Sequence, residues 1–112
     1  MNLKFEQDSV CFKITEEELD RILAGDSIAL SLRVGALSLR AGVVADAGVG
    51  SVRLGGEQEG ENSLSLFLYA APSVFQTLKD MGKSRDGLRW TDPQETEIVL
   101  QVDVRAPIRT AP

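Results

Sequence analysis

The chain of 112 residues contains no histidine and a single cysteine, Cys11. Histidine is the side chain that most often moves protons near neutral pH, so its absence excludes Ser/His/Asp triads, Cys/His dyads and zinc sites that contain imidazole. One cysteine excludes a disulfide within the chain and a cluster of several thiolates around a metal. We therefore assign no catalytic residue and no metal ligand, and we expect no cofactor.

Long apolar segments and an excess of positive charge are also missing. No run approaches the ~18 apolar residues that a membrane-spanning helix needs. Met1 to Gln7 alternate charged and apolar side chains, whereas a signal peptide has a basic stretch followed by an apolar one. The formal net charge of -5 repels nucleic acids and anionic lipids. We expect a soluble, cytoplasmic protein that binds neither nucleic acid nor membranes.

The rest of the composition is that of an ordinary globular domain, with 43% apolar and 26% charged residues. A chain of this length buries enough surface for one hydrophobic core. We expect residues 1–106 to form a single domain and residues 107–112, which begin and end with proline, to form a flexible tail.

Two segments have the apolar spacing of short helices. Thr15-Glu16-Glu17-Glu18 has the form of a capping box, which satisfies free N–H groups at a helix start, and Gly25 follows at the expected end. The second helix is predicted to begin at Pro72 and to end before Gly82. Each predicted helix is about ten residues long.

Most of the remaining chain alternates apolar and polar residues, as half-buried strands do. The alternation covers residues 3–5, 10–14, 28–34, 37–43, 63–70, 88–90 and 98–104. Residues 45–62 are rich in Gly, Ala and Glu, which predicts a mobile loop with a short edge strand in it.

These elements predict an α+β fold, with a mainly antiparallel curved sheet or partial barrel and two short helices. Residues 8–43 and 62–104 follow the same order of strand, helix, glycine and two strands, so a duplicated βαββ unit is a further hypothesis. Two such helices cover only one face of the sheet. The other face is then solvated, curled on itself or buried against a partner.

Residues Asp8 to Thr15, which read DSVCFKIT, lead into Glu18-Leu19 and a stop at Gly25. This stretch resembles an Asn-Ser-Ile-Arg-Phe-Arg-Leu-Thr stretch that enters a short helix in a family of small uncharacterised bacterial proteins, a domain of unknown function. The resemblance implies a bacterial origin and a length class. It implies no activity and supplies no catalytic residues.

Strand parity predicts a basic face. If the apolar sides of the strands all face the helices, then the opposite side of the sheet collects Lys13, Arg33, Arg40 and Arg105. Guanidinium groups there can hold phosphate or carboxylate through bidentate hydrogen bonds. The alternative is an ordinary solvated face with cross-strand acidic partners. Cys11 lies on the same side of its strand as Lys13. Either the positive charge of Lys13 lowers the pKa of the thiol and makes it reactive, or the thiol is half-buried and has no chemical role.

Two functions remain open. The first is a non-enzymatic binding or protein-interaction module, with another protein or a second copy of the chain as partner, that uses the uncovered sheet face or an edge strand. The second is a binder of, or an enzyme acting on, a small phosphorylated or other anionic ligand held by Lys13, Arg33, Arg40 and Arg105. The missing catalytic groups favour the first.

Overall fold

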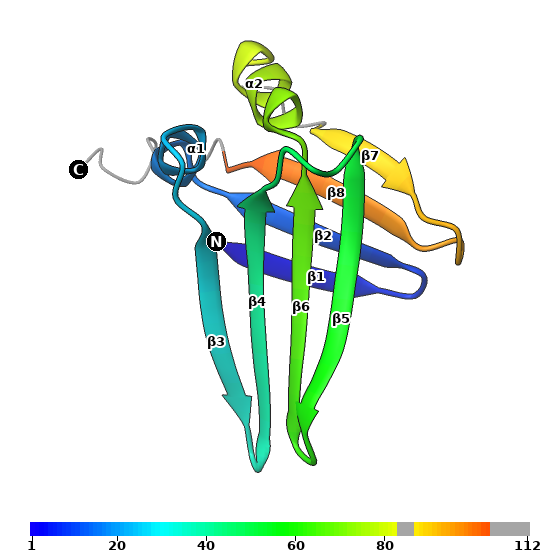
Figure 1. The fold of residues 1–112 in the computed structure, drawn as a ribbon. Helices are drawn as coiled ribbons and strands as arrows, with labels where there is room; N and C mark the ends of the chain where they lie inside the picture. Colours follow the sequence, from blue (N-terminus) through cyan, green and yellow to red (C-terminus); the bar gives the residue numbers. More distant parts are fainter. Residues whose placement is uncertain (83–86, 104–112) are drawn as a thin grey trace, which may run out of the picture.

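The computed structural model describes residues 1–82 and 87–103, and within them the chain forms eight strands and two helices (Figure 1). In chain order these are β1 (Asn2–Glu6), β2 (Ser9–Ile14), α1 (Glu16–Leu23), β3 (Ile28–Val34), β4 (Leu37–Ala45), β5 (Val52–Gly60), β6 (Ser63–Ala70), α2 (Pro72–Asp80), β7 (Leu88–Thr91) and β8 (Glu97–Val102). Sheet A has the strand order β1-β2-β8-β7, and sheet B has the order β3-β4-β6-β5.

Each sheet joins two hairpins through a parallel central pair, β2 with β8 in sheet A and β4 with β6 in sheet B. The α+β class and the two helices are thus confirmed. Antiparallel pairs predominate as predicted, four to two, but the strands form two open, mixed sheets and not one sheet. Neither sheet closes into a barrel. Alternation in the sequence shows which side of a strand is apolar, but not which strands pair. The duplicated βαββ unit stays a prediction.

The two sheets pack against each other through their apolar faces, and both helices cover one end of the molecule (Figure 1). The largest fully buried side chains come from both sheets and both helices, and they include Phe12, Ile22, Leu68, Phe75 and Leu100. Burial of each contributes about 1.5–3 kcal/mol. The face that each sheet turns toward the other is called its inner face below, and the opposite one its outer face.

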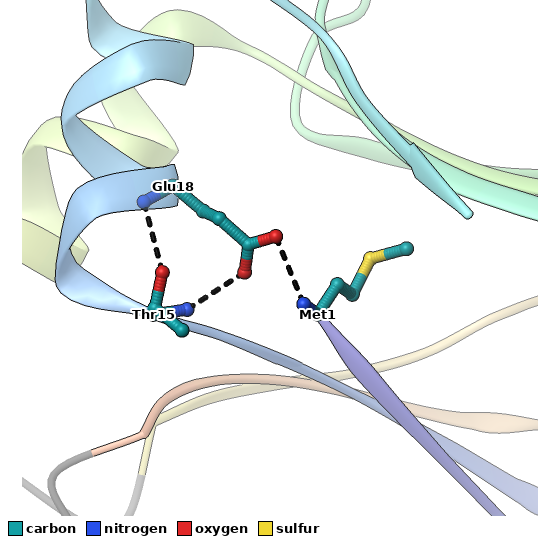
Figure 2. Close-up of polar contacts among 3 residues, drawn as sticks. All are labelled: Met1, Thr15 and Glu18. Atoms are coloured by element: carbon teal, nitrogen blue, oxygen red, sulfur yellow. Dashed lines mark hydrogen bonds and ion pairs between the residues drawn. The ribbon is translucent and has the colours of Figure 1, made fainter. Parts of the chain in front are cut away.

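The capping box at α1 forms as the sequence predicts. The Glu18 amide donates to Thr15 Oγ1 at 3.0 Å, and Thr15 N–H donates to Glu18 Oε1 at 2.9 Å (Figure 2). The Met1 ammonium donates to Glu18 Oε2 at 2.8 Å, so this carboxylate links the start of β1 to the start of α1 (Figure 2). Burial alone raises the pKa of Glu18, but these hydrogen bonds to its charged form outweigh burial and lower that pKa below its ordinary value.

Residues 45–62 differ from the prediction. They do contain the predicted edge strand, but this strand, β5 at the edge of sheet B, has nine residues and is not a short strand within a mobile loop. Glycine in this strand is compatible with pairing because the Tyr69 ring covers Gly55, where an added Cβ would lie 3.1 Å from Tyr69 Cε2.

Sheet B extends beyond sheet A. Its strands have seven to nine residues, whereas those of sheet A have four to six. In Figure 1 the β3–β4 and β5–β6 hairpins project well past sheet A as a single layer. We call this projecting part the distal half of sheet B.

Candidate functional site

The inner face of the distal half carries large apolar side chains that sheet A does not cover. In the strand register, Val34 pairs with Leu37, and Leu32, Leu39 and Leu64 form one row across three strands. We call these five residues the distal apolar surface. Val34 is 74% exposed, Leu37 57%, Leu64 53% and Leu32 46%, and Leu39 is partly buried.

Along a single strand of sheet B, side chains on the inner face change from buried in the core to exposed. On β6, Leu64 and Leu68 point to the same side of the sheet, and they are 53% and 0% exposed. The five side chains, with Ser38 and Asn62, line a cavity of about 200 Å³. Large contiguous patches of exposed apolar side chains are uncommon on monomeric proteins, and where they occur they are often protein, membrane or ligand contact surfaces.

The outer face of sheet B holds three arginines, Arg33, Arg40 and Arg53, and all three side chains are exposed. Arg40 lies over the ring of Phe67 at 5.8 Å, and Arg53 lies over the ring of Tyr69 at 4.2 Å. Among the described residues no carboxylate forms an ion pair with any of the three.

The predicted basic face is therefore only partly assembled. Arg33 and Arg40 share the outer face of sheet B, whereas Lys13 lies on β2 of sheet A. The two sheets meet through their inner faces, so the outer faces point away from each other and Lys13 cannot join the arginines. Arg105 lies outside the described residues. The prediction that all four residues share one sheet face is corrected, because it assumed a single sheet.

The predicted basic face did not include Arg53. It stands between the apolar residues Val52 and Leu54, and this alternation is the signal of a strand. The glycines and glutamates that follow concealed that signal. The distal apolar surface was missed for another reason, since apolar alternation looks the same whether or not a second layer covers it.

The outer face of sheet A forms a shallow polar cavity of about 360 Å³ that contains Lys4, Cys11, Lys13 and Arg89. Lys4 forms an ion pair with Glu6, and Arg89 forms an ion pair with Glu97. The Cys11 thiol donates to Gln101 Oε1 at 3.6 Å. Burial raises the pKa of this thiol, because desolvation outweighs the positive charges of Lys13, Lys4 and Arg89. The thiol is thus not activated as a nucleophile.

Among the described residues no group of three His, Cys, Asp or Glu side chains is placed to hold a metal ion. Neither helix in that part of the chain is long and apolar enough to cross a membrane.

Comparisons of the chain with family models, with curated proteins and with solved structures find no match. The resemblance of Asp8–Thr15 to a family of small bacterial proteins therefore stays a prediction.

Proposed function

We propose that the protein is a non-enzymatic protein-interaction module, and that the distal apolar surface binds a second copy of the chain. The exposure of Leu32, Val34, Leu37 and Leu64, which ranges from 46% to 74%, is the observation that carries this proposal. An apolar sheet face is normally covered by a second layer.

The shape of the molecule favours a second copy as that layer. Sheet A covers one part of the inner face of sheet B and leaves the distal half as a single layer (Figure 1). In a twofold dimer, each distal half would pack on the other at the ~10 Å spacing of stacked sheets. With the twofold axis perpendicular to the strands, the two copies of sheet A would then lie at opposite ends of the dimer.

The charge distribution supports the same partner. In the strand register of the distal half, Arg33, Arg40 and Glu57 all point to the outer face. The polar side chain in the Leu32 row of the inner face is the uncharged Gln58, which pairs with Leu64. When two distal apolar surfaces meet, these charged side chains therefore stay outside the contact. A low content of charged residues is typical of the centre of an interface.

The size of the surface predicts a weak dimer. Five partly exposed apolar side chains cover less than the ~800 Å² per partner of a standard interface. We expect a dissociation constant of about 1–100 µM, which corresponds to roughly 5–8 kcal/mol.

Sedimentation equilibrium over a concentration series tests the proposal. The wild type should shift from the 12.1 kDa chain mass to twice that mass as concentration rises. Leu64→Lys should remain monomeric, because it places a charge in the interface. Glu57→Lys places the same side chain on the outer face of the neighbouring strand and should still dimerise. A wild type that stays monomeric to about 500 µM, well above the expected dissociation constant, overturns the proposal, as does equal weakening by both variants.

A further inference from the structure

The outer face of the distal half, opposite the distal apolar surface, contains a groove of about 470 Å³. Its polar lining consists of Ser31, Arg33, Ser38, Arg40, Glu59 and Ser63, and we call it the arginine groove. We propose that the arginine groove binds the phosphate group of a small phosphorylated molecule. The lining also includes Leu32, Leu39 and Leu64, whose side chains belong to the distal apolar surface. The arginine and serine side chains point to the opposite face of the sheet, so a phosphate that they hold does not occupy the dimer interface.

The two arginines stand close enough to share one phosphate. Arg33 on β3 pairs with Ser38 on β4. Arg40 lies two residues beyond Ser38 on β4, so its side chain points to the same outer face as that of Arg33. Such diagonal neighbours have their Cβ atoms about 7–8 Å apart. Both guanidinium groups can therefore reach a ligand between them, and each can form two parallel hydrogen bonds to phosphate oxygens.

The charge of the arginines is not neutralised within the described part of the chain. The protein has 17 acidic and 12 basic residues, yet no carboxylate described in the structure forms an ion pair with Arg33 or Arg40. Glu59 is the carboxylate in the lining, so the groove has one positive charge in excess. An anion is the ligand that complements this local charge.

Phe67 helps to hold Arg40 in place. The guanidinium carbon lies 5.8 Å from the centre of the Phe67 ring. The ring can lie flat on the neighbouring strand because Gly42 has no side chain there, and an added Cβ would lie 2.4 Å from Phe67 Cε2. A guanidinium that stacks on a ring keeps its N–H edges available for an anion.

Serine hydroxyls complete the site. Ser31 pairs with Arg40, and Ser38 pairs with both Arg33 and Ser63, so the three hydroxyl-bearing residues of the lining flank the arginines. Hydroxyl groups donate to phosphate oxygens that the arginines leave free. A volume of about 470 Å³ lies within the range of small-molecule sites and exceeds the need of a phosphate ion. This size favours a phosphate ester over free phosphate.

NMR titration of the full chain at constant ionic strength, with inorganic phosphate and with glycerol phosphate, tests the proposal. We expect saturable shifts of the Arg33 and Arg40 side-chain N–H signals with either ligand, and tighter binding of the ester. Chloride at the same ionic strength should leave these signals unchanged. If neither phosphate compound gives a saturable shift, or if inorganic phosphate binds more tightly than the ester, the proposal is wrong.

Matched variants separate a built site from general electrostatics. Arg40→Ala should weaken binding of glycerol phosphate by about tenfold or more, since it removes charge-assisted hydrogen bonds. Arg53→Ala loses the same charge and a similar ring contact outside the groove, and it should change binding by less than about twofold. Glu59→Gln should strengthen binding, because it removes a repelling charge. Equal weakening by Arg40→Ala and Arg53→Ala contradicts the assignment.

Discussion

Sheet A and sheet B share one arrangement, two hairpins joined by a parallel pair, yet they expose different kinds of surface. The four- to six-residue strands of sheet A keep most of their apolar side chains inside the core. The seven- to nine-residue strands of sheet B continue the same alternation past the end of sheet A. Strand length beyond the covering layer, and not a change of pattern, therefore creates the proposed binding surface.

The largest expected effect compares two leucines on β6. Leu68→Ala should lower the free energy of unfolding by about 2–5 kcal/mol, because it opens a cavity between the sheets. Leu64→Ala, on the same side of the same strand, should cost less than about 1 kcal/mol in the monomer, because Leu64 is 53% exposed. Urea denaturation at low protein concentration measures both. Similar losses would show that the distal half is covered in the monomer and would remove the contrast between the two parts of sheet B.

A second effect concerns glycine, which occurs in the strands of sheet B and in none of the described strands of sheet A. Gly42→Ala should destabilise the fold by about 1–3 kcal/mol, since the added Cβ would approach Phe67 Cε2 to 2.4 Å and the Ile28 carbonyl oxygen to 2.5 Å. Gly56→Ala is the control, because its nearest neighbour would lie at 3.8 Å, and it should stay within about 0.5 kcal/mol of wild type. Thermal unfolding of both variants checks this. A neutral Gly42→Ala would contradict the flat placement of the Phe67 ring.

The smallest effect lies where sheet A meets α1. The folded pKa of Glu18 is lowered, so its charged form stabilises the fold above the ordinary carboxyl pKa, and this contribution is lost as pH falls through the lower folded value. Glu18→Gln keeps the capping box but removes the charge. The variant should therefore be less stable than wild type at about pH 7, and the difference should shrink toward about pH 3.

Urea denaturation across that pH range measures the Glu18 difference. Glu17→Gln, one residue away on an exposed position of the same helical turn, is the control and should show a smaller effect. A constant difference for Glu18→Gln at all pH values would mean that its charge does not stabilise the link between sheet A and α1.

The sequence predicted local structure better than pairing. The capping box at Thr15–Glu18, the start of α2 at Pro72 and the apolar sides of β2, β3, β4 and β8 follow from short-range patterns. The parallel pairing of β2 with β8 joins residues almost ninety positions apart, such as Cys11 and Val99, and no local pattern specifies it. For this reason Arg33 and Arg40 were rightly placed on one face, whereas Lys13 was wrongly added to them.

Self-association through the distal half of sheet B can be observed residue by residue with methyl NMR over a dilution series. Assigned methyl signals of Leu32, Val34, Leu37, Leu39 and Leu64 should shift with protein concentration, and those of the core residues Leu68 and Leu100 should not. Signals that stay constant across the range in which the dimer is expected would contradict the claim. Concentration-dependent shifts confined to Val99, on the outer face of sheet A, would contradict it equally.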